Sequence, residues 1–255
     1  MKYCLLSSGS QGNSAFVCQG ETKILIDCGI TKKRLLERLT PLGVGLDEIQ
    51  RLLITHGHVD HVSGIKALPE EKWMTSPQVL KEELAPEQYF SPYVPFQVGE
   101  LTITPLPLSH DATNTVGFLI EGGNESLVYI TDTGYLKEKV LKRIADKTYY
   151  IFESNHDTKM LFTSKRSPFL IRRIHSNIGH LDNVESASYL AGLIGQDTKE
   201  VTLAHLSDEC NTPDLALETF KTVMISELGH EPDVLVRCGS IKEEVKGGDW
   251  EKDLS

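Results

Sequence analysis

Short apolar segments separated by turns dominate the first half of the chain, and segments of helical period become frequent in the second half. Apolar runs rich in Val, Ile, Leu, Tyr and Phe predict strands. These runs occur at residues 2–6, 15–18, 23–27, 49–55, 72–75, 101–105, 115–121, 126–131, 149–153, 199–203 and 233–236. Apolar residues spaced three and four apart predict helices. They occur at residues 31–42, 77–84, 136–145, 169–176, 183–193 and 212–228.

This order of elements predicts an α/β fold. Strands precede helices in both halves of the chain, which fits two sheets sandwiched between helices. No Pro/Gly-rich linker and no low-complexity segment divides the sequence. We therefore expect one domain over residues 1–255, with residues 246–255 frayed at the C-terminus.

The composition is that of an ordinary globular protein, with 40% hydrophobic and 24% charged residues. No window approaches 18 consecutive apolar residues, so we expect no membrane span. Five cysteines without a C-x-x-C pair and a short N-terminal stretch before Ser7 predict reduced thiols in the cytoplasm. The net charge of −10 weighs against a broad, sequence-independent nucleic-acid surface. It leaves room for a local basic patch, or for metal ions that supply positive charge.

The most informative segment follows the apolar run at 49–55. His56, His58, Asp60 and His61 place three imidazoles and a carboxylate within six positions. Imidazole nitrogens and carboxylate oxygens are ligands for Zn²⁺ and similar divalent ions. One turn of this kind can serve two metals about 3.5–4 Å apart. A histidine-rich surface loop is the alternative, but crowded imidazoles repel one another when protonated.

A dinuclear site needs further ligands, and four other apolar runs end on suitable side chains. His110, Asp132 and His205 each follow such a run, and Asp132 is the candidate for a carboxylate that bridges two ions. Asp27 follows the run at 23–27, and we expect it to hydrogen-bond a ligand histidine from outside the metal shell. Both aspartates precede a glycine by two residues, so a role as turn formers stays open.

The cluster and its distant partners resemble the metallo-β-lactamase superfamily, in the order found in its phosphodiesterase branches. Further motifs resemble the bacterial YycJ/WalJ group, whose members are described as exonucleases acting on DNA from the 5′ end. These motifs are Ser-Gly-Ser-Gln-Gly-Asn-Ser at 8–14, Glu-Ser-Asn-His-Asp at 153–157, Gly-His-Leu at 179–181 and His-Leu-Ser at 205–207. The resemblance extends from about residue 2 to about residue 240.

This resemblance implies an αββα sandwich of two mixed sheets flanked by helices, with two divalent ions, Zn²⁺, Mn²⁺ or Fe²⁺. The first ion would be bound by His56, His58 and His110. The second would be bound by Asp60, His61 and His205, with Asp132 as the bridge. Asn155, His156 and Ser207 would contact the substrate. His180, or His156, would protonate the leaving group. Without the resemblance, we would expect His180 to be a histidine at the start of a helix.

Four departures from the group's pattern concern the expected substrate-facing rim of the site rather than the metal ligands. Gly57 stands where relatives often carry a larger polar residue, and Asp182 stands where we expect serine. Cys210 interrupts an expected Asn-Asn, and residues 163–168 also differ. These changes obscure the substrate and leave the metal ligands intact.

Three functions remain open on the sequence. The first is a phosphodiesterase, most simply a 5′–3′ DNA exonuclease, in which a metal-activated hydroxide oriented by Asp60 attacks phosphorus. The second is a hydrolase of small molecules, such as a cyclic-phosphate diesterase, a lactonase or a thioesterase. The third is a non-catalytic metal-binding protein, which the complete set of ligands disfavours. Lys165, Arg166, Arg172 and Arg173 form a basic run that either holds a phosphate backbone or is a solvated helix face.

Overall fold

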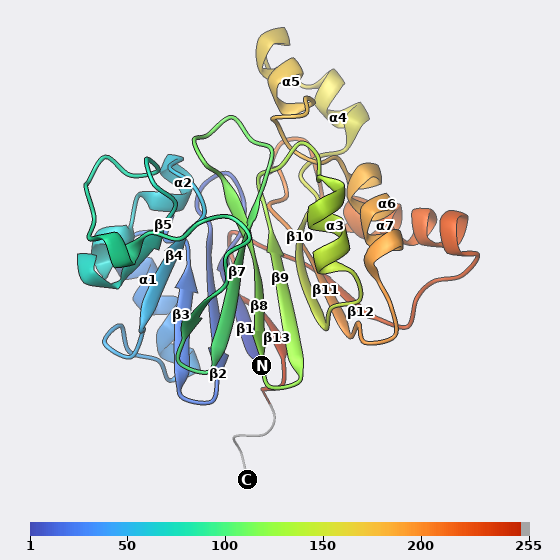
Figure 1. Ribbon diagram of the computed structural model, residues 1–255. Coiled ribbons are helices and arrows are strands. Elements are labelled where there is room, and N and C mark those ends of the chain that lie inside the picture. Colours follow the sequence, from blue (N-terminus) through green and yellow to red (C-terminus); the bar gives the residue numbers. More distant parts are fainter. Residues whose placement is uncertain (251–255) are drawn as a thin grey trace.

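Two β-sheets pack face to face, with helices on both outer faces, in a computed structural model that describes residues 1–250 (Figure 1). Both sheets contain parallel and antiparallel pairs. The expected αββα sandwich of two mixed sheets is therefore confirmed. Side chains such as Ile26, Leu53, Phe118 and Tyr129 form one buried cluster between the sheets.

The first sheet has the strand order β13-β1-β2-β3-β4-β5. Its strands are β1 (Lys2–Ser7), β2 (Ser14–Gln19), β3 (Thr22–Ile26), β4 (Arg51–Ile54), β5 (Trp73–Thr75) and β13 (Val245–Gly248). Strands β3, β4 and β5 are parallel, and the other pairs are antiparallel. Helix α1 (Lys32–Leu39) covers the outer face, where Leu35 and Leu39 pack with Leu25 and Leu52.

The second sheet has the strand order β12-β11-β10-β9-β8-β7-β6. Its strands are β6 (Phe96–Val98), β7 (Leu101–Pro107), β8 (Val116–Gly122), β9 (Glu125–Ile130), β10 (Tyr149–Glu153), β11 (Glu200–Ala204) and β12 (Leu235–Cys238). The helices on its outer face are α3 (Glu138–Ile144), α6 (Asn183–Leu193) and α7 (Pro213–Leu228). Val140, Leu190 and Phe220 from these helices join the buried cluster on that face. None of the helices in residues 1–250 is long and apolar enough to cross a lipid bilayer.

Strand direction brings distant residues to one edge of the sandwich. β9, β10 and β11 are parallel, and β3 and β4 are parallel, so their C-terminal ends meet at the same edge. Three residues at these ends, Asp27, Asp132 and His205, have left-handed backbones with φ of 56°, 60° and 56°. Such φ values are uncommon outside glycine, and Asn, Asp and His adopt them most readily. The chain thus turns sharply where the candidate ligands stand.

A helical arm projects past this edge. We call residues 158–174 the arm; it contains α4 (Thr158–Thr163) and α5 (Pro168–Ile174). Figure 1 shows both helices beyond the strand ends, on the side of the molecule that also carries α2 (Val59–Val62). Ser167 caps α5 by accepting a hydrogen bond from the Leu170 amide, and Pro168 occupies its first turn, so the local sequence favours a helix start there.

Two expectations from the sequence are wrong. Residues 77–84 form bends rather than a helix, because Gln78 has a left-handed φ of 66°. A Cβ at Gly57 would lie 2.6 Å from the Val79 carbonyl oxygen, so this irregular segment packs against the metal-ligand loop in a way that only glycine permits. Residues 246–248, expected to fray, belong to β13 and pair with β1; residues 251–255 of the expected frayed end lie outside the described residues. Helix α4 and strands β6 and β13 were not predicted from the sequence pattern.

Candidate metal centre

The loop between β4 and α2 carries the histidine cluster. His58 occupies the N-cap position of α2, so Asp60 and His61 fall in the first turn of that helix while His56 stays in the extended loop. The rings of His56 and His61 lie 4.1 Å apart, centroid to centroid. The loop thus contributes to two groups of ligand atoms, His56 and His58 to one and Asp60 and His61 to the other.

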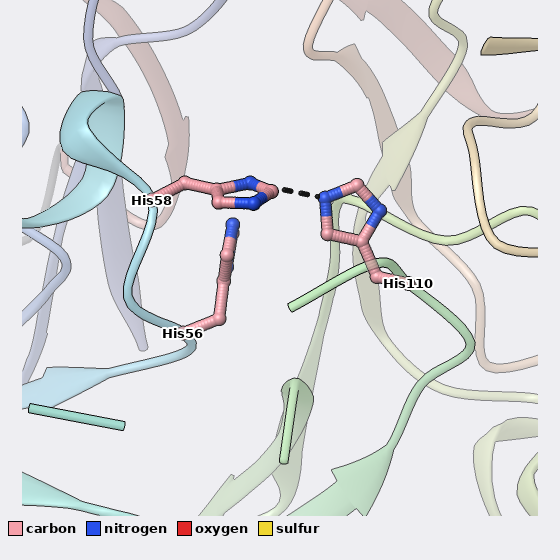
Figure 2. A group of neighbouring side chains, drawn as sticks. All are labelled: His56, His58 and His110. Carbon is pink, nitrogen blue, oxygen red and sulfur yellow. Dashed lines mark hydrogen bonds between the residues drawn. The ribbon is translucent and has the colours of Figure 1, made fainter. Parts of the chain in front are cut away.

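His56, His58 and His110 form the first group of ligand atoms, all within 4.8 Å of one another. Figure 2 shows the two loop histidines facing His110, which comes from the segment after β7. The His110 Nε2 and His58 Nδ1 atoms are 3.2 Å apart. A ring nitrogen of His56 points toward the His58 ring. Three imidazoles with converging nitrogens are a common ligand set for Zn²⁺.

Asp60, His61 and His205 form a second group with the same spread of ligand atoms. The Asp60 Oδ2 atom lies 3.6 Å from His61 Nε2 and 3.8 Å from His205 Nε2. Asp132 connects the two groups, since it also clusters with His56 and His61 and lies 3.8 Å from His110 Nε2. The structure thus brings together all seven residues singled out as metal ligands.

Asp27 holds the loop from behind. Its Oδ2 atom accepts hydrogen bonds from His61 Nδ1 at 2.7 Å and from the Thr55 hydroxyl at 2.8 Å, and its Oδ1 atom accepts from the Thr55 amide at 2.8 Å. The carboxylate is fully buried. Because Nδ1 of His61 is occupied in this way, Nε2 faces the centre, the arrangement expected of a residue that orients a ligand histidine.

Glu153, the last residue of β10, is a site residue that the sequence analysis missed. Its buried Oε1 atom lies 2.9 Å from both His180 Nδ1 and His205 Nδ1. Its oxygens also accept hydrogen bonds from the amides of Asp132 and Thr133. One carboxylate therefore fixes the ring orientation of His205 and His180 and the turn of Asp132. A carboxylate ending an apolar run was the signal, the same one that pointed to Asp132.

Two further missed residues belong to the motif at 8–14. The Asn13 side-chain amide lies 3.0 Å from His61 Nε2 and 3.2 Å from Asp60 Oδ2. The Ser8 hydroxyl accepts a hydrogen bond from the His205 amide at 2.8 Å. This Gly/Ser-rich turn therefore wraps the second ligand group, a role that its composition alone does not reveal.

The electrostatics of the site follow from burial and close charges. Burial lowers the pKa of His56 well below its usual value, and neighbouring imidazoles add to this effect. Burial also opposes the charged form of His61, but Asp132 and Asp27 outweigh it and raise its pKa to about 10. Burial raises the pKa of Asp132, yet the charges of His205 and His61 prevail and hold it well below its usual value. Protons on imidazoles here balance buried carboxylates, so a divalent cation that replaced them would release protons on binding.

The donors fit such a cation. Nε2 of His56 is buried and has no hydrogen-bond partner among residues 1–250. Leaving a buried polar atom without a partner costs free energy of about 1–3 kcal/mol. A metal ion among converging imidazoles and carboxylates would remove that cost, and nitrogen and carboxylate donors suit Zn²⁺, Mn²⁺ or Fe²⁺.

A pocket of about 210 Å³ opens over the cluster. Asn155, Ser207 and His180 line this pocket, and the arm contributes Arg166 and Arg173. Lys165 and Arg172 are not among its lining residues, so the structure separates the basic run into two arginines at the pocket and two cations away from it.

His156 lies elsewhere. Its side chain is fully buried and is not among the residues that line the pocket. It clusters instead with His175 and Asp182 behind the arm. His156 therefore lies apart from Asn155 and Ser207, the two other residues predicted to contact the substrate, which line the pocket.

The sequence and the fold also match known proteins. The family model described as a β-lactamase superfamily domain matches residues 22–206. The exodeoxyribonuclease YycJ of Bacillus anthracis is 29% identical over 88% of this chain and 89% of its own. The exodeoxyribonuclease WalJ of Streptococcus pneumoniae is 30% identical over 84% of this chain and 85% of its own.

Among solved structures, the metallo-β-lactamase fold protein YhfI of Bacillus subtilis superposes with a TM-score of 0.71 at 17% identity, covering 96% of this chain and 99% of that one. At that identity the match shows the fold alone. The family model, the relatives and the fold agree with the resemblance seen in the sequence. The chain belongs to the metallo-β-lactamase superfamily.

Proposed function

We propose that this protein is a dinuclear metal-dependent phosphodiesterase that degrades DNA from its 5′ end, built as a single domain. The observation that carries the proposal is the pair of ligand groups, His56/His58/His110 and Asp60/His61/His205, joined by Asp132. A complete double set of this kind is typical of hydrolases rather than of proteins that merely bind metal. The choice of DNA is supported by the relatives named as exodeoxyribonucleases.

Each ligand group would hold one ion, Zn²⁺, Mn²⁺ or Fe²⁺, and Asp132 would lie between them. When bound, the ions supply a nucleophile at neutral pH and neutralise charge that develops on the phosphate oxygens. Asp60 would orient the attacking group as well as bind metal. Asp27 and Glu153 keep Nδ1 of His61 and of His205 occupied, so that Nε2 of each ring faces the centre.

His180 is the candidate general acid. Its Nδ1 atom lies 2.9 Å from Glu153, which leaves Nε2 available to a substrate in the pocket that His180 lines. A proton given to the leaving oxygen by such a group accelerates a reaction by about 10²–10⁴-fold. His156 no longer competes for this role, since it is buried outside the pocket.

Arg166 and Arg173 would hold phosphates next to the one that is cleaved. Both line the pocket, and each is also held by an ion pair, Arg166 with Glu209 and Arg173 with Asp111. Asn155 and Ser207 add polar groups to the same wall. At about 210 Å³ the pocket is smaller than the roughly 300–1,000 Å³ of sites that enclose a whole small molecule. It suits the end of a longer substrate.

We also propose a cytoplasmic location. All five cysteines are free, and the two sheets pack together through a buried apolar cluster rather than through disulfides. Reduced thiols are the normal state in that compartment.

The test uses protein loaded with Zn²⁺ or Mn²⁺ and two substrates. One is a duplex with a 5′ phosphate and a 3′ label, and the other is bis-p-nitrophenyl phosphate. We expect the 3′-labelled strand to shorten as nucleotides are released from its 5′ end, and we expect a duplex whose 5′ end is closed by a hairpin to resist. Cleavage of the small ester without nucleotide release from DNA would refute the nuclease proposal and favour a small-molecule hydrolase.

Two variants separate the metal mechanism from contamination and misfolding. His58→Ala removes one ligand of the first group, and activity on both substrates should fall by at least about 10²-fold. His230→Ala changes an exposed histidine in the segment after α7 and should keep wild-type activity. Full activity in His58→Ala would refute the assignment of the metal centre.

A further inference from the structure

A second cluster of metal-ligating side chains lies outside the pocket, at the base of the arm. It consists of His156, His175 and Asp182, whose ligand atoms all lie within 4.8 Å of one another. His156 precedes α4, His175 caps the C-terminal end of α5, and Asp182 caps the N-terminal end of α6. The cluster therefore joins the segments that enter and leave the arm.

His156 has an unused donor atom. Its side chain is fully buried, and Nε2 has no hydrogen-bond partner among residues 1–250. Nδ1 lies 3.3 Å from the Asn155 side-chain oxygen. Nε2 is therefore the nitrogen left for a ligand, and a buried polar atom without a partner is costly enough to need an explanation.

Asp182 adds a buried negative charge. It is 7% exposed and forms no ion pair with a Lys or Arg of residues 1–250. Each of its oxygens accepts one hydrogen bond, from the Thr158 hydroxyl at 2.7 Å and from the Glu185 amide at 2.8 Å. A carboxylate oxygen has a second lone pair, so both bonds can persist beside a cation.

His175 provides the route of entry. It is exposed to solvent, and its ring lies 5.9 Å from that of His156, nearly perpendicular to it at 80°. A divalent ion with bonds of about 2 Å would need only a small closing movement of this exposed side chain. Solvent would fill the remaining coordination position.

We propose that His156, His175 and Asp182 bind a further divalent cation, of the Zn²⁺ class, that closes the arm at its base. Two imidazoles and one carboxylate are a ligand set that suits this ion. The arm begins two residues after His156 and ends one residue before His175, so the ion links both of its ends. Closing a loop in this way restricts the motion of what it carries. The arm carries Arg166, and Arg173 lies in its last turn, so the ion would hold both arginines over the pocket.

The ion is not part of the catalytic centre, and its detection does not depend on catalysis. The experiment loads purified protein with Zn²⁺ alone, removes unbound metal and measures Zn²⁺ per chain by elemental analysis. Asp182→Ser keeps a side chain that caps helices well but removes the carboxylate, and His175→Ala removes the exposed ligand. His230→Ala is the matched control, an exposed histidine away from the cluster.

We expect Asp182→Ser and His175→Ala each to bind one Zn²⁺ fewer per chain than wild type and His230→Ala, whatever number the catalytic centre holds. Equal stoichiometry in all four proteins would overturn the proposal. A further comparison separates this site from the proposed function. The inactive His58→Ala protein should still bind one Zn²⁺ more per chain than the double variant His58→Ala/His175→Ala.

Protection of the arm gives a second readout. Trypsin cleaves after Lys165 and Arg166, which lie between α4 and α5. We assume that the ion must dissociate before the arm can open to the protease. At a free Zn²⁺ concentration about ten times the dissociation constant of this site, cleavage should then slow about tenfold. We expect this slowing in wild type and His230→Ala and its loss in His175→Ala. Slowing of equal size in His175→Ala would contradict the placement of the ion.

Discussion

Asp27 offers the sharpest test of how the fold positions the metal ligands, through the single substitution Asp27→Asn. Asparagine has nearly the same shape and tolerates the left-handed φ of 56° at this position, so the backbone turn after β3 should survive. What changes is one acceptor. The amide oxygen can still accept from the Thr55 amide, but the amide nitrogen can no longer accept the hydrogens that His61 Nδ1 and the Thr55 hydroxyl donate to Oδ2, at 2.7 and 2.8 Å.

The expected loss follows from that contact. A hydrogen bond to a charged, buried group contributes about 1.5–3 kcal/mol, and 1.4 kcal/mol corresponds to a factor of ten in affinity. Residues that orient a metal ligand in this way typically change metal affinity by about 10–100-fold when they are replaced. We therefore expect Asp27→Asn to weaken Zn²⁺ binding by about 10–100-fold, measured by competition with a chromophoric chelator.

The control is Asp146→Asn, because Asp146 also has a left-handed φ, of 49°, but lies far from the histidines, where it accepts a hydrogen bond from the Asp197 amide. This variant should bind Zn²⁺ as wild type does. Unchanged affinity in Asp27→Asn would show that the His61 ring is oriented without the carboxylate, and the reasoning from the hydrogen bond would be wrong.

Three further predictions concern the acid, the arm and the termini. His180→Gln should lower kcat by about 10²–10⁴-fold with unchanged metal content, measured by steady-state assay and elemental analysis; loss of metal instead would make His180 a ligand. Arg173→Met should reduce the magnitude of the slope of log affinity for DNA against log salt concentration by about 0.7–0.9. Arg172→Met, which changes a residue outside the pocket, should leave this slope unchanged. Equal slopes in the two variants would refute the division of the basic run. Burial raises the pKa of Glu125, but hydrogen bonds from the N-terminal ammonium, Tyr149 and Lys199 outweigh it and lower the pKa to about 2. The stability that this ionised carboxylate adds is present above pH 4.5 and is lost as the pH falls toward 2. Because the group is partly exposed, Glu125→Gln should cost only about 1 kcal/mol at pH 7 and progressively less as the pH falls from 4.5 through about 2, measured by urea unfolding of metal-free protein.

Much of the fold could be predicted from the sequence because most of its strands coincide with short apolar runs. The residues that follow such runs meet at one edge of a sheet, which is why His110, Asp132 and His205 could be paired with a cluster far away in the chain. The local pattern was enough to predict these ligands, because each ligand directly follows the apolar run that predicts its strand.

Where tertiary contacts decide, the sequence was a poor guide. Residues 77–84 have a helical period, yet they pack as an irregular segment on the Gly57 loop. Glu153 looks like a polar end to a strand until the fold places His180 and His205 beside it. His156 sits in a motif next to Asn155, and only the direction in which the chain leaves β10 decides that one side chain faces the pocket and the other does not.

The left-handed residues at the strand ends have a consequence for how this centre can change over generations. At Asp27, Asp132 and His205 the backbone excludes bulky and branched side chains but accepts aspartate, asparagine and histidine. The codons of these three amino acids differ only in their first base. At Asp132 and His205 a single mutation can therefore exchange one metal donor for another, or for an amide that binds metal weakly, without disturbing the turn. The scaffold can lose or alter its metals in one step and still fold.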